Sequence, residues 1–139
     1  MSVDNFLDSN VFVYLFDDSD HGKQQRAASL IYNSIEEGTA CISFQVVQET
    51  MNVMLRKIGV STKETHTFFN RVLVPLWRIN PTQALYRRGL DVQARYRLSF
   101  YDSLIVAAAL EAGCQTLYSE DLQHAQIIEH LTIRNPFLT

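Results

Sequence analysis

The chain has 139 residues, of which 47% are hydrophobic and 19% charged, and its formal net charge is −3. The length predicts one domain over residues 1–139, and the balance is typical of a globular protein rather than of a disordered chain. A general nucleic-acid binder is expected to be basic. Any contact with nucleic acid must therefore rest on a local basic surface.

The remaining composition indicates where the protein acts. Cys41 and Cys114 lack the spacing of a metal or redox motif, which favours buried free thiols in a reducing compartment. The four histidines show no paired ligand spacing, so a zinc site is not expected. The N-terminus lacks signal-peptide features, and no apolar run is long enough to span a bilayer. We therefore expect a cytoplasmic protein without a membrane contact.

The chain opens with an expected strand, a short helix and a longer helix. Residues 5–7 are an apolar run, and Ser9 or Asn10 is the expected cap of the short helix. The acidic run 17–20 is interpreted as a solvated loop rather than a metal site. Helical spacing of apolar residues then predicts the longer helix, which ends before Gly38. Asp8 is thereby placed at the carboxyl end of the first strand.

A second strand is expected at residues 39–43, followed by a helix that runs to about Ile58. Glu49 lies on this helix, bordered by Val46 and Val53. An acid among apolar neighbours requires a partner or a metal. The alternative is an exposed glutamate at the edge of the apolar stripe.

The next two helices are expected to form a hairpin. Gly59 ends the first helix, and Ser61 opens a capping box at the start of the second. Phe68 and Phe69 lie on the apolar face of the second helix, and Pro75 is expected to end it. This aromatic face is interpreted as core, although it also offers a surface for self-association.

A short strand is expected at residues 76–79, and Asn80 is the expected cap of the following helix. That helix carries several arginines, whose default interpretation is a solvated face. Arg95 and Arg97 come just before the next acid, so they are candidates to reach the same cleft.

The last third contains two more acids in similar settings. Asp102 lies in the first turn of a helix whose residues 104–110 are almost wholly apolar. Its alternative role is structural, because an acid there opposes the helix dipole. A strand at residues 115–118 is followed directly by the run 119–121, which ends in Asp121. The alternative role of this acid is to cap a loop. Residues 131–133 are expected to form an edge strand.

Four acids fall at one end of the expected parallel sheet: Asp8, Glu49, Asp102 and Asp121. Clustered carboxylates repel one another unless they are protonated or bridged by a cation. An all-oxygen ligand set suits Mg²⁺ or Mn²⁺, and both ions retain water for a substrate phosphate.

The order and spacing of these residues resemble the PIN domain, the nuclease fold of VapC-like toxins. The resemblance covers essentially the whole chain and is carried by the runs 6–11, 47–49, 101–105 and 118–121. It implies an α/β, three-layer fold with a mostly parallel central sheet of four to five short strands flanked by helices.

The resemblance also implies Mg²⁺-dependent cleavage of single-stranded RNA by an endoribonuclease, with Mn²⁺ as a possible substitute. Asp8 and Asp102 would be the main metal ligands. Glu49 and Asp121 would complete the acidic pocket and position the attacking water. All four are present, which predicts an active member of the family.

Further roles follow from the same resemblance. Asn10 and Ser119 would fix the ligand carboxylates or contact phosphate, and Arg95 and Arg97 are candidates for contact with RNA. The expected partners are a small antitoxin protein, of a type II toxin–antitoxin pair, and a second copy of the chain.

Other functions remain open at this point. The protein could be an RNA-processing PIN nuclease that is not a toxin, or a non-catalytic binding module of the same fold. A response-regulator receiver domain also clusters acids in an α/β fold, but it needs a lysine after a late strand. The lysines here lie early, at positions 23, 57 and 63.

Overall fold

The computed structural model describes residues 3–138, and its centre is a six-stranded sheet in the order β3-β2-β1-β4-β6-β5. The strands are β1 (Asn5–Leu7), β2 (Ala40–Ser43), β3 (Trp77–Ile79), β4 (Thr116–Tyr118), β5 (Ile127–Ile128) and β6 (Leu131–Arg134). All neighbouring strands pair in parallel except β5, which runs antiparallel to β6. The expected mostly parallel α/β sheet is confirmed, although it has six strands rather than the expected four to five. The expected edge position of residues 131–133 is wrong, because β5 pairs outside them.

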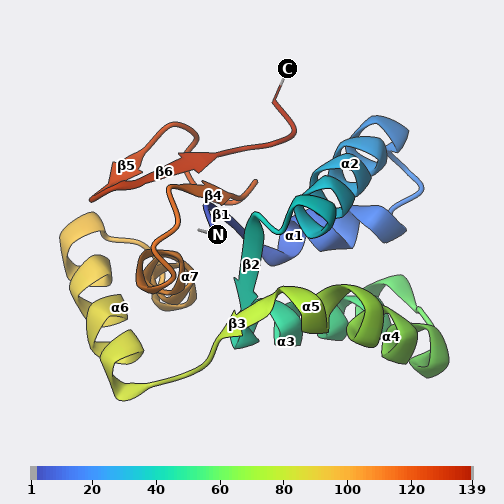
Figure 1. The fold of residues 1–139 in the computed structure, drawn as a ribbon, viewed down its shortest axis with the longest axis horizontal. Helices are drawn as coiled ribbons and strands as arrows, with labels where there is room; N and C mark the ends of the chain where they lie inside the picture. The colour runs from blue at the N-terminus through green and yellow to red at the C-terminus, as the bar shows by residue number, and fades with distance from the viewer. Residues whose placement is uncertain (1–2, 139) are drawn as a thin grey trace.

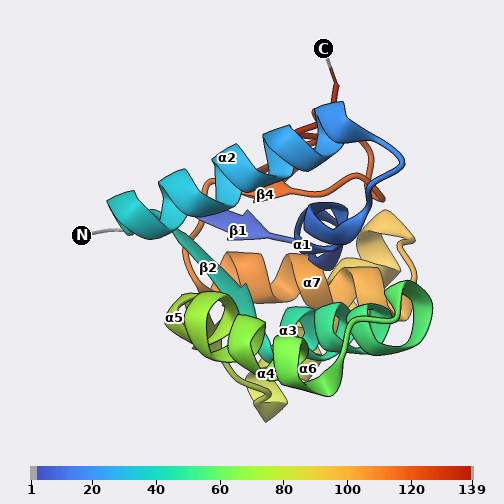
Figure 2. The same ribbon diagram turned by 90° about the vertical axis from the view of Figure 1, so that its right-hand side faces the viewer.

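Helices cover both faces of this sheet. They are α1 (Ser9–Val13), α2 (His21–Glu37), α3 (Phe44–Val53), α4 (Thr62–Phe68), α5 (Val74–Leu76), α6 (Gln83–Tyr96) and α7 (Phe100–Glu111), with the short 3₁₀ helix η1 (Tyr14–Phe16) and the short π-helices η2 (Met54–Ile58) and η3 (Phe69–Leu73). Figure 2 shows α2 on one side of strands β1 and β4 and α7 on the other. In Figure 1, α6 lies alongside α7, and α3, α4 and α5 form a separate group beyond β3. These layers place β1 and α7 in the interior.

The first helix starts earlier than the sequence suggested. Its cap is Asp8, whose side chain accepts a hydrogen bond from the backbone N–H of Ser9, so the expectation of a cap at Ser9 or Asn10 is wrong. The backbone N–H of Asp8 donates to the carbonyl of Tyr118 at 3.0 Å. The chain therefore turns into α1 directly after its last bond to β4, which brings the carboxylate of Asp8 to the end of the sheet.

Two other helix ends also differ from expectation. Pro75 does not end its helix, because it lies in the first turn of α5, where a missing N–H leaves no bond unmade. The cap of α6 is Thr82 rather than Asn80, and its hydroxyl accepts from the N–H of Leu85 at 3.0 Å. By contrast, Gly59 has a φ of 84° just after η2, as a helix end requires.

Apolar side chains from both layers meet the sheet in a continuous core. Phe6 and Leu7 are fully buried on β1. Phe68 contacts Phe12 and Phe16 edge-on, with ring centroids 6.5 and 5.0 Å apart, so the aromatic face of the hairpin belongs partly to the core. None of the helices within the described residues is long and apolar enough to cross a bilayer.

The two cysteines are buried, as expected for free thiols. Cys41 lies on β2 and Cys114 directly before β4, and their sulfur atoms are 3.8 Å apart. Sequence spacing had suggested two isolated thiols. The sheet brings them into contact because β1 pairs with both β2 and β4.

Candidate active site

Asp8 is the most deeply buried acid at the carboxyl end of the sheet, with 4% of its surface exposed. One carboxylate oxygen accepts from the N–H of Ser9 at 2.7 Å, and the other accepts from the hydroxyl of Ser119 at 2.8 Å. Burying a carboxylate is costly, and these two bonds offset part of that cost. The side chain is therefore held in one orientation.

The loop after β4 connects Asp121 to the same centre. The N–H of Asp121 donates to the hydroxyl of Ser119 at 3.2 Å. The side-chain amide of Asn10 donates to a carboxylate oxygen of Asp121 at 3.1 Å, and its carbonyl accepts from the N–H of Glu120 at 3.2 Å. Ser119 and Asn10 thus link the first and the last expected acids, which are far apart in sequence.

Burial raises the pKa of Asp8 to about 6, although the hydrogen bonds from Ser119 and Ser9 lower it. The nearby negative charges of Asp121 and Asp102 raise this pKa further. Because burial is the largest cause, the charge on Asp8 is unfavourable chiefly through lost hydration and only secondarily through repulsion.

Glu49 is half-buried on α3 and belongs to the same electrostatic group. Burial raises its pKa to about 7, and the charge of Asp8 is the next cause. The charges of Asp102 and Asp121 raise this pKa as well, whereas a hydrogen bond from Gln45 lowers it. All four expected acids therefore lie within electrostatic range of one another.

Asp102 lies in the first turn of α7, and its N–H donates to the Ser99 hydroxyl at 3.2 Å. Ser99 therefore caps the helix that carries Asp102. The amide of Gln45 donates to the carbonyl of Tyr101 at 3.1 Å, which ties α3 to the start of α7 beside Glu49. None of the four acids forms an ion pair with a lysine, arginine or histidine in residues 3–138.

The donor set fits a hard cation, because it consists of carboxylate oxygens with no cationic partner. In the described chain, however, no three His, Cys, Asp or Glu side chains lie close enough together to hold one metal ion. The acids are therefore close enough for their charges to interact, but too far apart for three of them to bind one metal ion. Each oxygen of Asp8 accepts one hydrogen bond and keeps a second lone pair for a cation.

The comparisons with known proteins identify the family. The family model of the PIN domain matches residues 6–129. The chain belongs to the PIN domain family. A search of the curated proteins finds no match.

Three solved structures with a similar fold are a toxin or toxin–antitoxin complexes. A toxin–antitoxin complex from Klebsiella pneumoniae is 20% identical with a TM-score of 0.67, covering 95% of this chain and 97% of that chain. VapBC2 from Rickettsia felis, bound to a DNA fragment from its promoter, is 17% identical with a TM-score of 0.65, covering 94% and 97%. VapC20 from Mycobacterium tuberculosis, a toxin that cleaves the sarcin-ricin loop, is 19% identical with a TM-score of 0.60, covering 83% and 88%. At these identities the likeness establishes the PIN fold alone.

A second layer of contacts in this PIN domain was not foreseen. Glu120 accepts hydrogen bonds from the Tyr14 hydroxyl at 2.5 Å and from the Lys23 ammonium at 2.6 Å. This ion pair raises the pKa of Lys23 and anchors the loop that carries Asp121 to η1 and α2. No sequence pattern reveals it, because Lys23 and Glu120 are 97 positions apart.

The two arginines expected near RNA are both exposed at the end of α6. Arg95 is exposed, and its guanidinium lies 5.4 Å from the centre of the Tyr96 ring. It lines a cavity of about 210 Å³ that contains none of the four acids. Arg97 is exposed and ends α6 with a φ of 56°. Their contact with RNA stays a prediction.

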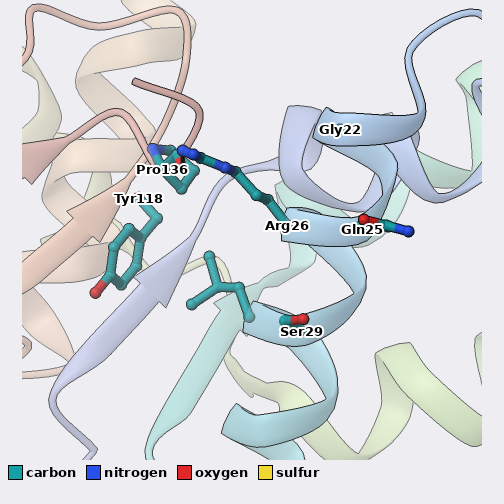
Figure 3. A pocket seen from close by; sticks show the side chains of 7 residues that line it. Gly22, Gln25, Arg26, Ser29, Tyr118 and Pro136 are labelled. Carbon is teal, nitrogen blue, oxygen red and sulfur yellow. Dashed lines mark hydrogen bonds between the residues drawn. The ribbon is translucent and has the colours of Figure 1, made fainter. Parts of the chain in front are cut away.

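The PIN domain has a larger cavity, of about 560 Å³, between α2 and the end of β4. Figure 3 shows Arg26 reaching from α2 towards Pro136, with Tyr118 beside it. The Arg26 guanidinium donates to the carbonyl of Leu138 at 3.0 Å, so this cavity is shaped by the C-terminal segment. It contains none of the four acids, and its size does not make it the centre of the chemistry.

Proposed function

We propose that the protein is a metal-dependent endoribonuclease that cleaves single-stranded RNA. The observation that carries this proposal is the setting of Asp8, a buried carboxylate whose negative charge has no cationic partner among the described residues. The negative charges of three further acids, Glu49, Asp102 and Asp121, act on Asp8. They lie at the end of the sheet where α/β proteins bind ligands. A divalent cation would relieve the cost of keeping these carboxylates ionised.

The four acids would have two different roles in this reaction. Asp8 and Asp102 would hold Mg²⁺, or Mn²⁺ in its place, and Glu49 and Asp121 would complete the pocket and orient the attacking water. When bound, the metal lowers the pKa of that water and neutralises charge on the phosphate. Asn10 and Ser119 would keep the carboxylates in place through the hydrogen bonds described above.

We also propose that this nuclease is the cytoplasmic toxin of a type II toxin–antitoxin pair, held inactive by a small antitoxin. The support is the family together with solved structures of the same fold that are toxin–antitoxin complexes. A cationic side chain of the antitoxin would enter the acidic pocket, where pairing offsets the cost of desolvation. A gene for a small DNA-binding protein directly upstream is the expected context.

Cleavage assays test the nuclease directly. The purified protein is incubated with a panel of structured RNAs that expose single-stranded loops, with Mg²⁺ and with excess chelator. Cleavage is expected only with the metal. Asp8→Asn should lower the rate by more than the roughly 10–100-fold that removal of an outer-shell partner costs.

Asp91→Asn is the matched control, because Asp91 is an exposed acid on α6 and the substitution makes the same change in net charge. It should cleave at the parent rate. Cleavage that persists in excess chelator, or an Asp8→Asn variant as active as Asp91→Asn, would refute the proposed mechanism. RNA binding without chelator-sensitive cleavage would instead identify a binding module.

A further inference from the structure

A cavity of about 320 Å³ opens directly beside the acidic centre. Asp121 and Asn10 belong both to this cavity and to the candidate active site. The remaining lining residues come from α1, η1, the loop after it, the end of α3, η2 and the loop after β4: Ser9, Val13, Tyr14, Asp17, Val53, Lys57, Ile58 and Glu120. Pockets for small molecules commonly measure about 300–1,000 Å³, so this one suits a ligand about the size of a single nucleotide.

The walls of the cavity combine apolar and polar groups. Val13, Val53 and Ile58 supply an aliphatic surface from three different elements. The ring of Tyr14 contacts Phe137, with ring centroids 4.7 Å apart, and its hydroxyl is bonded to Glu120. An aliphatic surface between polar groups is what a flat base with a hydrogen-bonding edge requires.

Two charged side chains of the cavity, Glu120 and Lys57, differ in whether they already form an ion pair. The carboxylate of Glu120 is already neutralised by Lys23 at 2.6 Å. Lys57 is exposed and forms no ion pair with any of the described residues. Its ammonium is therefore available to an anion that enters from solvent.

Asp17 supplies an acceptor in the same cavity. One of its carboxylate oxygens accepts from both the N–H and the hydroxyl of Ser19, at 3.0 and 2.5 Å. These bonds are the main reason why the pKa of Asp17 is lowered, and the charge of Lys57 contributes less. An ionised carboxylate only accepts hydrogen bonds, so it selects groups that donate.

We propose that this cavity holds one nucleotide of the RNA next to the cleaved phosphate, with its base against Val13, Val53 and Ile58 and a phosphate on Lys57. This inference rests on the proposed function. The Asp17 carboxylate then favours bases that carry an amino group, namely adenine, cytosine and guanine. Uracil is disfavoured because its only donor, N3–H, lies between two carbonyl oxygens that repel a carboxylate. Asp121 connects the cavity to the acidic centre, so the bound nucleotide and the reacting phosphate are adjacent.

The first test compares two lysine variants. Lys57→Gln and Lys63→Gln remove the same charge from exposed positions on either side of Gly59, but only Lys57 lines the cavity. Fluorescence anisotropy with a labelled single-stranded RNA, in chelator to prevent cleavage, gives the affinity at several salt concentrations. Lys57→Gln should bind more weakly, with a slope of log affinity against log salt that is smaller by about 0.7. Equal behaviour of the two variants would overturn the inference.

The second test observes the cavity directly and does not depend on cleavage. Nucleoside 5′-monophosphates are titrated to saturation while the methyl signals of Val53 and Ile58 are followed by NMR. Both should shift, and UMP should bind most weakly. The methyl groups of Ile127, exposed on the distant edge strand β5, should not move. Unmoved Val53 and Ile58 signals, or shifts equal to those of Ile127, would contradict the inference.

The two tests separate this inference from the proposed function. If the parent cleaves RNA but the cavity methyl groups do not respond, only the nucleotide site is wrong. If the cavity binds nucleotides and Lys57→Gln weakens RNA binding while no metal-dependent cleavage occurs, the nuclease function is wrong and the nucleotide site stands.

Discussion

The carboxylate of Asp8 is costly to ionise, because it is buried with only two hydrogen bonds. No cationic side chain of the described chain pairs with it. Its pKa of about 6 in the folded protein exceeds the value near 3.9 of an unfolded chain. Below about pH 4 both states hold the proton, and burial then carries no charge penalty. As the pH rises from 4 to 6, the unfolded state loses its proton first, so the native state is destabilised.

Asp8→Asn should therefore stabilise the metal-free protein at pH 7.5 and not at pH 4. The difference between the two pH values is expected to be about 3 kcal/mol at most, because one pKa unit corresponds to about 1.4 kcal/mol. Urea unfolding in chelator at both pH values measures it. Mg²⁺ should raise the stability of the parent and much less that of the variant.

Asp91→Asn again serves as the control, because it removes the same charge from an exposed position on α6. A stability gain for Asp8→Asn that is the same at pH 4 and pH 7.5 would mean that burial of charge is not its cause. Glu49→Gln should behave like Asp8→Asn over a window that extends to about pH 7. Its effect should be smaller, because its half-exposed carboxylate is better hydrated.

Sequence reasoning at the residue scale found the four acids, and the family resemblance named Asn10 and Ser119 beside them, but Glu120, Lys23 and Tyr14 were not predicted. Asp8 and Asp121 each follow an apolar strand, and that local pattern is visible in the sequence. The hydroxyl of Ser119 on Asp8 and the Lys23–Glu120 pair depend on how distant segments meet. No local propensity encodes such contacts, which is why Glu120, Lys23 and Tyr14 were missed.

At the scale of elements, the turn between η2 and α4 rests on one backbone conformation. Gly59 has a φ of 84°, and a Cβ built there meets nothing within 4 Å. Gly59→Ala should therefore destabilise the protein by roughly 1–2 kcal/mol through backbone strain alone. Thermal or urea unfolding measures this loss.

Gly22→Ala provides the contrast, because Gly22 lies inside α2 without a positive φ and its added Cβ would meet only Asp20, at 3.5 Å. Alanine favours helix over glycine by up to about 1 kcal/mol, so this variant should be neutral or more stable. Equal destabilisation of both variants would show that lost packing or a folding defect, not the backbone of Gly59, is responsible.

Element types were more predictable than element ends. Hydrophobic periodicity indicated all the longer helices and five of the six strands. The helix end predicted at Pro75 was wrong because proline is compatible with a first helical turn. The cap predicted at Asn80 was wrong because Thr82, closer to the helix, is also a good cap. The strand β5 has two residues, too few for any alternation to show.

At the scale of the whole molecule, the helical hairpin leaves apolar side chains uncovered. Leu55, Val74 and Trp77 are 44%, 44% and 37% exposed. A cavity of about 330 Å³ beside them is lined by Leu55 with Met51, Thr62, Thr65, His66 and Phe69. We propose that this surface forms the homodimer suggested by the sequence.

Leu55→Asp should convert the dimer to a monomer, because a carboxylate buried in an apolar interface is unfavourable. Light scattering across a concentration series measures the mass. Leu90→Asp is the control, since Leu90 is 55% exposed on α6, away from the hairpin, and its variant should remain dimeric. A parent protein that stays monomeric at the highest concentration would refute the dimer.

The pairing of β1 has a consequence for how the protein is made. Asp8 leaves the ribosome well before Ser119, the residue that holds it, because Ser119 is synthesised 111 positions later. At about 5–20 residues per second, roughly 5–20 s of translation separate the two. Throughout that interval the nascent chain lacks β4 and the loop that completes the acidic centre. The acidic centre can therefore form only after Ser119 and Asp121 have been synthesised. Under the proposed function, the ribosome and the message are not exposed to a complete acidic centre before that point.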